Sequence, residues 1–237
     1  MLNIKRLPFI IVFFAFFISK NTNAQKINQF DANKQRTGVW QKYYPNNKIR
    51  YSGTFKNGKE IGVFKFYDDS NSSFPSIIKT FTEGKSEVLV EFYKTTGDIQ
   101  SKGYFIDKNR VGKWTFYFTN GKVLSEEFYK DGKLDGILIN YYPNGKITEE
   151  SFYKNGLKDG VSKTYTSDGV LIEEVNYKEG KLNGSARYFE LNGNLKELGD
   201  YKDGKRVGEW EYYLDGEITT EKELKKNKSS YSKSNEN

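Results

Sequence analysis

Apolar and polar residues alternate along this chain in short runs that glycine-containing pairs interrupt. In residues 136–159, the β-prone runs Ile137–Tyr142 and Ile147–Tyr153 are separated by Asn144-Gly145 and followed by Asn155-Gly156. Asn-Gly and Asp-Gly pairs provide the positive φ angles of type I′ turns, and two alternating runs around such a pair indicate a β-hairpin. Each segment of this kind is therefore predicted to form one hairpin with type I′ turns.

This hairpin pattern is repeated in eight rows of 24 residues, apart from a two-residue insertion in the second row and a last row that is one residue short. The rows start at Gly38, Gly62, Val88, Gly112, Gly136, Gly160, Gly184 and Gly208. A fixed period in this range is the signature of a repeat protein whose units stack on their neighbours. We therefore expect an all-β fold in which the hairpins join in a long antiparallel meander. The starting glycines suit a tight bend or a close backbone approach.

Three apolar columns run through the rows, because side chains alternate between the two faces of a strand. The residue five positions after each row start is aromatic: Tyr43, Tyr67, Tyr93, Tyr117, Tyr141, Tyr165, Phe189 and Tyr213. The second strand carries two further columns, Phe55, Phe81, Phe105, Tyr129, Tyr153, Tyr177, Tyr201 and Leu224, and Ile49, Ile77, Ile99, Val123, Ile147, Leu171, Leu195 and Ile218. We predict that these columns form the cross-strand ladders that hold the array together. An aromatic binding groove is the alternative.

A less regular set of aromatic residues lies on the face opposite the fifth-position column. We expect its members to be exposed, and they form the candidate interaction surface: Trp40, Tyr44, Trp114, Phe118, Tyr142 and Trp210. The insertion in row two, residues 68–76, reads as an exposed loop, and loops often carry function. Function is therefore expected where the rows differ from one another.

Both ends of the chain differ from the array. Residues 1–24 combine Lys5 and Arg6 with an apolar run and a small-residue cleavage site, which is typical of a secretory signal peptide. An uncleaved membrane anchor is the alternative, but the apolar run is shorter than the roughly 20 residues that span a bilayer. We expect export to the periplasm, the outer envelope or the medium, without lipid anchoring because no cysteine is present. The array is assigned to residues 25–224, and residues 225–237 to a disordered polar tail.

Composition narrows the chemistry. The chain has no histidine and no cysteine, which removes most nucleophilic, acid–base and transition-metal sites. Its net charge is +7, but residues 25–224 hold 31 Lys and Arg against 30 Asp and Glu, a balance of +1. A nucleic-acid-binding protein concentrates positive charge on its folded surface. We therefore expect no nucleic acid partner, no cofactor, no metal and no enzymatic activity.

Adjacent glutamates recur in three rows, as Glu126-Glu127, Glu149-Glu150 and Glu173-Glu174. Equivalent residues of successive hairpins lie roughly 10 Å apart, slightly more than the separation of about 6.5–9.5 Å between the carboxylates of inverting glycosidases. A weak calcium site or a hydrolase is the alternative to a solvated acidic stripe that lysines neutralise. We expect the solvated stripe.

The row pattern resembles the MORN-repeat family in its bacterial variant form, including the antitoxin components of the YwqK type. The resemblance covers residues 31–224 and is strongest in Tyr129–Gly136 and Tyr201–Trp210. It implies an elongated, twisted, single-layer antiparallel sheet, and roles in scaffolding, dimerisation or phospholipid contact. Only Trp40, Trp114 and Trp210 keep the tryptophan of the pattern.

Together these features predict an exported, non-enzymatic scaffold that binds another protein. A lipid- or glycan-binding surface at the cell envelope is the alternative. The open edges of a long sheet also permit end-to-end self-association.

Overall fold

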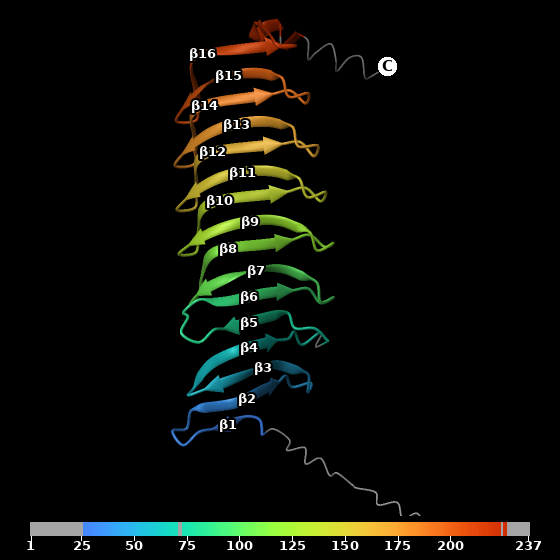
Figure 1. Cartoon of the computed structure of the whole chain (residues 1–237), viewed down its shortest axis with the longest axis vertical. Coiled ribbons are helices and arrows are strands. Elements are labelled where there is room, and N and C mark those ends of the chain that lie inside the picture. The colour runs from blue at the N-terminus through green and yellow to red at the C-terminus, as the bar shows by residue number, and fades with distance from the viewer. Residues whose placement is uncertain (1–25, 71–72, 224, 227–237) are drawn as a thin grey trace, which may run out of the picture.

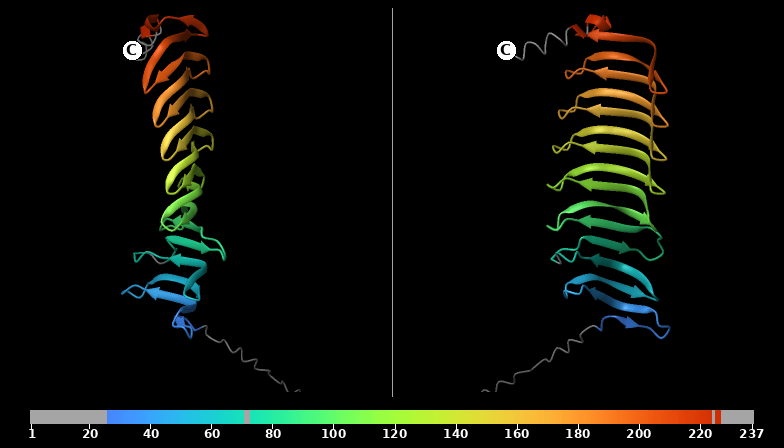
Figure 2. Two further views of the ribbon diagram at one scale, coloured as in Figure 1. Left: turned by 90° about the vertical axis from the view of Figure 1, so that its left-hand side faces the viewer. Right: turned by 180° about the vertical axis from the view of Figure 1, so that it is seen from behind.

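The computed structural model describes residues 26–70, 73–223 and 225–226. They form one elongated ribbon, a single layer of antiparallel strands stacked along the long axis of the molecule (Figures 1 and 2). The sheet has 17 strands, and each described strand pairs with the next one in the sequence. The predicted all-β meander of eight hairpins is confirmed.

The strands are β1 (Gln29–Phe30), β2 (Arg36–Tyr43), β3 (Ile49–Lys56), β4 (Lys59–Phe66), β5 (Ile77–Phe81), β6 (Val88–Tyr93), β7 (Ile99–Ile106), β8 (Asn109–Tyr117), β9 (Val123–Lys130), β10 (Lys133–Tyr141), β11 (Ile147–Lys154), β12 (Leu157–Tyr165), β13 (Leu171–Lys178), β14 (Lys181–Phe189), β15 (Leu195–Lys202), β16 (Lys205–Leu214) and β17 (Glu217–Thr219). The eight rows correspond to the hairpins β2–β3 through β16–β17. β1 precedes them at one end of the ribbon (Figure 1).

The two turns of the row that starts at Gly136 differ. Between rows, Asn155 and Gly156 have φ angles of 50° and 89°, as the predicted type I′ turn requires. Within the row, Gly145 has a positive φ angle but Asn144 does not, so the prediction of a second type I′ turn is wrong here, although Asp215 and Gly216 of the last row, with φ angles of 51° and 88°, agree with it. Here the Tyr142 carbonyl accepts a hydrogen bond from the Gly145 N–H, and the Asn144 side chain accepts one from the Lys146 N–H. This is a type I turn with proline at its second position, followed by a glycine bulge.

The bulge decides which side chains share a face. Tyr141 pairs with Ile147 but Asn140 pairs with Glu149, so one residue of β11 is extra. Across this extra residue the strict alternation of faces is interrupted. The residues of β11 that follow it therefore point to the face opposite to the one that alternation counted from Ile147 predicts. We call the face with the fifth-position column the tyrosine face, and the face with Trp40, Trp114 and Trp210 the tryptophan face. The column from Ile49 to Ile218 lies with the tyrosines, and the column from Phe55 to Tyr201 lies with the tryptophans.

The deepest ladder lies two positions after each row start, on the tryptophan face. Trp114 is 0% exposed and Phe64 is 1% exposed, whereas Tyr43 of the fifth-position column is 49% exposed. The fifth-position aromatics, predicted to be one of three columns that hold the array together, are thus not the most deeply buried column. The physical reason is a glycine in the preceding strand: a Cβ atom on Gly103 would lie 2.3 Å from the Trp114 ring. Because Gly103 has none, the ring lies flat against the sheet.

Three row-starting glycines, Gly136, Gly160 and Gly184, come close to a side chain of the preceding strand, whereas the other four have no atom within 4 Å of an added Cβ atom. Gly136 has a φ angle of 123°, and a Cβ atom there would lie 3.0 Å from the Cβ atom of Phe128. The register with β9 shifts at the same place, between Leu134 and Leu138. The glycine thus allows each row to bend away from the preceding strand.

The two ends of the described ribbon differ from the rows between them. Phe30 of β1 packs edge-on against Trp40, with ring centroids 5.1 Å apart. At the other end, residues 221–223 and 225–226 are helical, so the predicted disordered tail is wrong for residues 225–226. The Thr220 hydroxyl and the Glu223 carboxylate each accept a hydrogen bond from the other residue's N–H, as in a capping box.

Other predictions fall partly or wholly outside the described residues. The signal peptide, residues 1–24, and residues 227–237 of the tail lie outside them. Of the row-two insertion, residues 68–70 and 73–74 are exposed as predicted, and the Phe74 ring, 49% exposed, lies beside Gly97 of the next row. Among the described residues, no helix has the length and apolar character needed to cross a membrane.

Candidate functional site

The six aromatics of the candidate interaction surface do not form one exposed patch. Trp114 is completely buried, and the other five are half-buried. The Tyr44 hydroxyl donates a hydrogen bond to the Tyr67 carbonyl, and the Tyr142 hydroxyl donates one to the Tyr165 carbonyl. These two tyrosines therefore connect the turns of successive rows. The expectation that all six are exposed is wrong, because ring stacking against the sheet and turn-to-turn hydrogen bonds cover them.

An arginine covers each tryptophan. The guanidinium carbon lies 4.9 Å from the ring centroid for Arg36 and Trp40, 4.5 Å for Arg110 and Trp114, and 3.8 Å for Arg206 and Trp210. Such distances are those of cation–π contacts. Each arginine precedes its tryptophan by four residues in the pattern Arg-x-Gly-x-Trp, so the sequence contains the signal although our sequence analysis did not use it.

Further along the tryptophan face, polar groups replace the rings. Lys158 Nζ donates a hydrogen bond of 2.6 Å to Glu149, and Ser151 donates another of 2.6 Å to the same oxygen. The hydroxyls of Ser151 and Ser162 are 2.7 Å apart, and both serines are buried. Burial works against the charge of Glu149, but the hydrogen bonds from Lys158 and Ser151 hold its pKa below the ordinary value. The pKa of Lys158 is raised, since Glu149 outweighs the effect of burial. A lysine held protonated cannot serve as a general base for a serine nucleophile.

The next two glutamates of the same column differ from each other. Glu197 pairs with Arg206 at 3.0 Å. Among the described residues, Glu173 has no hydrogen-bonding partner, and it lies half-buried between Thr164 and Tyr188 of the adjacent strands. Burial raises the pKa of Glu173, and Lys158 only partly opposes this effect. The column thus contains one carboxylate without its own cation.

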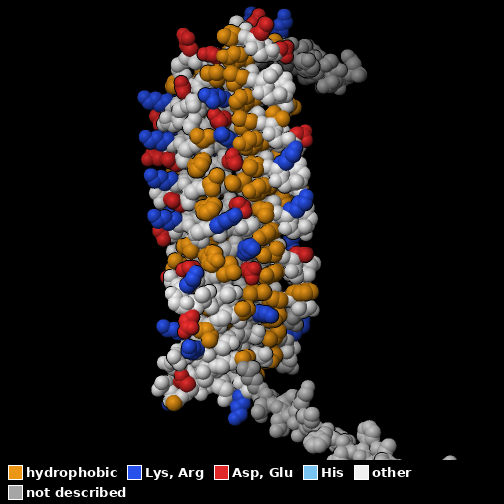
Figure 3. All heavy atoms as spheres, in the orientation of Figure 1, with side chains coloured by type: hydrophobic (Ala, Val, Ile, Leu, Met, Phe, Trp, Pro, Cys, Tyr) orange, Lys and Arg blue, Asp and Glu red, His pale blue; other side chains and the backbone are white. Residues whose placement is uncertain are grey.

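The tyrosine face carries alternating charges beside exposed apolar side chains. Lys113 pairs with Glu126 at 2.6 Å, and Lys163 pairs with Glu174 at 3.3 Å. Tyr104 is 42% exposed and Phe152 is 47% exposed on this face. Two shallow hollows lie beside them, one of about 470 Å³ that includes Tyr104 and one of about 320 Å³ that includes Phe152. Seen from one side, hydrophobic side chains form a band along the length of the ribbon (Figure 3).

The adjacent glutamates separate onto opposite faces. Glu126 pairs with Lys113 on the tyrosine face, whereas Glu127 accepts hydrogen bonds from Ser125 and Tyr129 on the tryptophan face. Two neighbours on one strand cannot act on the same substrate atom from opposite sides of a sheet. Among the described residues, no group of three or more histidine, cysteine, aspartate or glutamate side chains is arranged to hold a metal ion.

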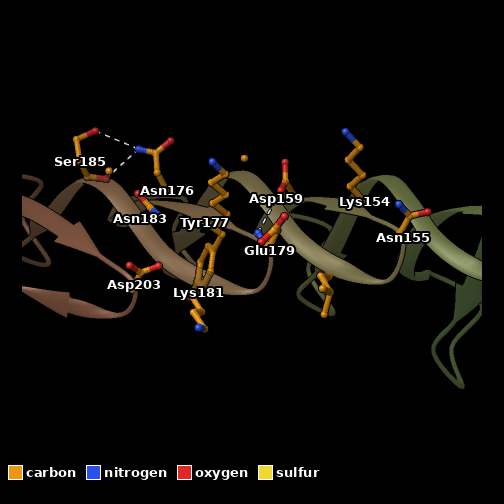
Figure 4. Close-up of a pocket in the computed structure, with 14 residues that line it drawn as sticks. Lys154, Asn155, Asp159, Asn176, Tyr177, Glu179, Lys181, Asn183, Ser185 and Asp203 are labelled. Carbon is orange, nitrogen blue, oxygen red and sulfur yellow. Dashed lines mark hydrogen bonds between the residues drawn. The ribbon is translucent and has the colours of Figure 1, made fainter.

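A groove follows the edge of the ribbon where the type I′ turns lie (Figure 4). It has a volume of about 1200 Å³ and contains mixed charges and amides, among them Lys154, Asp159 and Asn183. Asp159 accepts a hydrogen bond from the Glu179 N–H, and Asn176 donates to Ser185. These groups hold neighbouring turns together and do not converge on one point in Figure 4.

A family model described as MORN repeat variant matches five segments of the chain, residues 36–57, 110–131, 134–155, 158–179 and 182–203. Each segment covers one hairpin of the ribbon, such as β8–β9. The chain therefore contains repeats of the MORN variant type, as its row pattern predicted. Repeats of this family make the protein a repeat-type binding module. No curated protein matches the chain.

Two solved structures share weak similarity with the ribbon. One is a mutant of S. aureus TarM in complex with fondaparinux, alpha-GlcNAc-glycerol and UDP, with 20% identity and a TM-score of 0.32 over 41% of this chain and 19% of that one. The other is TarM, with 19% identity and a TM-score of 0.30 over 43% of this chain and 20% of that one. The matching part of the chain thus spans about a fifth of the length of either structure.

Proposed function

We propose that this protein is an exported, non-enzymatic scaffold that binds another protein through its tyrosine face. The observation that carries the proposal is the pair of exposed aromatic residues, Tyr104 and Phe152, beside an ordered row of ion pairs. Exposed apolar side chains that are surrounded by charged side chains are typical of protein-binding surfaces. The ion pairs would set the orientation of the partner, and the aromatics would provide its buried contact.

The proposed location depends on residues 1–24, which have the composition of a signal peptide. The partner would accordingly lie at the cell envelope or outside the cell. An antitoxin role, which the YwqK-type resemblance implies, would need a toxin that acts outside the cytoplasm.

The test is cross-linking and affinity purification of the tagged full-length protein from intact source cells, followed by mass spectrometry. We expect one protein to be recovered repeatedly with the unchanged chain and to be lost with Tyr104→Glu and Phe152→Glu. Leu191→Glu is the matched control, because Leu191 is 77% exposed in a turn away from the proposed surface. Equal recovery with all three variants would contradict the proposal.

A lipid- or glycan-binding surface is the second candidate, and the arginines over Trp40 and Trp210 favour it because a cation beside an aromatic ring suits an anionic headgroup or sugar. Titration with anionic liposomes and with envelope polysaccharides, followed by tryptophan fluorescence, tests it. We expect no spectral change if the tyrosine face is the binding surface. A saturable blue shift that Arg206→Gln abolishes would favour this second candidate.

A further inference from the structure

Glutamates occupy equivalent positions of the tryptophan face in three successive rows, Glu149, Glu173 and Glu197, and one of the three lacks a paired cation. Lys158 and Arg206 both occupy the second position before a row start, and each pairs with a glutamate of the preceding strand, Glu149 at 2.6 Å and Glu197 at 3.0 Å. Leu182 occupies this position in the row between them. The carboxylate at the equivalent position, Glu173, therefore lacks the cation that its two neighbours have.

The backbone around the three positions is the same. Lys158 pairs across the strands with Tyr153, Leu182 with Tyr177, and Arg206 with Tyr201. The missing cation is thus a difference in side chains and not a distortion of the sheet. Glu149 also accepts hydrogen bonds from Ser151 and Asn140, where the row of Glu173 has Val175 and Thr164. A cation placed over Leu182 would reach Glu173 as Lys158 reaches Glu149.

The surroundings of Glu173 make its charge costly. It is half-buried between Thr164 and Tyr188, and the nearby Lys158 already donates hydrogen bonds to Glu149 and Ser162. A carboxylate that is partly removed from water and has no partner destabilises the fold until a cation pairs with it.

We propose that a lysine or arginine side chain of a protein partner takes the place beside Glu173 that Lys158 and Arg206 take in the neighbouring rows. Leu182 and the rings of Tyr177 and Tyr201 would contact the aliphatic stem and the charged head of that side chain. Lys158 already shows this geometry, with its ammonium 5.1 Å from the Tyr177 ring centroid. The inference rests on the proposed function in that the cation belongs to a protein, but it concerns the opposite face of the ribbon.

The test uses the folded full-length protein and a synthetic peptide, acetyl-Gly-Gly-Arg-Gly-Gly-amide. Its matched neutral analogue contains citrulline in place of arginine. Nuclear magnetic resonance follows the signals of Glu173, Thr164 and Tyr188 during titration. We expect saturable shifts with the arginine peptide and none with the citrulline peptide.

Two substitutions of Leu182 separate the effect of a positive charge on peptide binding from the effect of a changed side-chain shape. Leu182→Lys supplies the missing cation from within the chain, so the peptide should bind at least about tenfold more weakly, and the variant should melt at the same or a higher temperature. Leu182→Met keeps an apolar side chain and should bind the peptide as the unchanged chain does. Glu173→Gln should lose the shifts.

Several outcomes would overturn the inference: equal shifts with citrulline, unchanged binding to Leu182→Lys, no saturable shift, or tighter binding of spermidine than of the arginine peptide at the same signals. If the arginine peptide binds but no partner protein is recovered from cells, the cation site is supported and the proposed function is rejected. A partner recovered from cells without peptide binding would reject this inference alone.

Discussion

At the scale of single residues, stability depends on matches between neighbours in adjacent strands. A large ring at the second position of a row requires a very small residue in the strand before it, as in Phe64 over Gly53, Trp114 over Gly103 and Trp210 over Gly199. In the row that starts at Gly160, where the ring is absent, two hydrogen-bonded serines, Ser151 and Ser162, are buried at these positions. Each match excludes water from the sheet without a second layer of structure.

Two glutamates at equivalent positions should respond to substitution in opposite directions. Glu149→Gln should lower the free energy of unfolding at neutral pH by about 1 kcal/mol, because it weakens the pairing of half-buried Lys158. Glu173→Gln should raise it by up to about 1 kcal/mol, because it removes an unpaired charge. Urea denaturation checks both values.

The pH dependence of these variants follows from the two pKa shifts. The lowered pKa of Glu149 means that its contribution is present above the unfolded pKa and is lost as the pH falls through the folded pKa. The raised pKa of Glu173 means that its cost appears as the pH rises, so the gain from Glu173→Gln should vanish in acid. A gain of equal size at acidic and neutral pH would contradict the assignment.

At the scale of the hairpin, irregularities in the strands matter as much as the strands themselves. The bulge after the first turn exchanges the faces of the second strand, which places Tyr153 with the tryptophans and Ile147 with the tyrosines. The glycine at the start of the row bends the chain so that Phe128 can pack beside Gly136. A hairpin without these two features would present different side chains to its neighbours.

Alanine substitutions at two equivalent row-starting glycines should separate the cost of the positive φ angle from the cost of the contact with Phe128. Gly136→Ala should destabilise the protein by more than about 1 kcal/mol, because its φ angle of 123° and the contact with Phe128 both oppose a Cβ atom. Gly208→Ala is the matched control, with a φ angle of 68° and no atom within 4 Å of the added Cβ atom. Thermal unfolding of both variants checks the order, and equal losses would contradict a role for the Phe128 contact.

At the scale of the whole molecule, the ribbon is a one-dimensional array. Each described strand contacts chiefly the strands before and after it, and both faces remain open along the length (Figure 2). Stability in such an array is a sum over rows and their interfaces. At one end β1 pairs with the first residues of β2, and at the other a short helical segment follows β17.

Removal of one complete row should therefore be tolerated. Deletion of residues 136–159 joins Asp135 to Gly160 and keeps the alternation of strand direction and face. We expect the shortened protein to keep the β-sheet circular dichroism signal and to unfold cooperatively. Deletion of residues 136–147, half a row, is the control and should prevent folding because it reverses the direction of every following strand.

The sequence by itself determined the period, the hairpins, their order and the repeat type. These depend on local turn chemistry and on alternation, which can be read from Asn155-Gly156 or from the recurring aromatics. The sequence also contained the Arg-x-Gly-x-Trp pattern that accompanies each tryptophan. Hence the all-β meander and its eight rows were predictable before the structure was known.

The tertiary structure alone decided which face each column occupies and how deeply it is buried. A single extra residue at each bulge reverses the face to which the following side chains point. Because Gly103 has no Cβ atom, the Trp114 ring packs against the sheet and is buried. The exposed Tyr104 and Phe152, and the cation missing beside Glu173, emerge only once neighbouring rows are placed side by side. Local residue preferences fix the hairpins, but the contacts between rows determine the surfaces that remain free to bind.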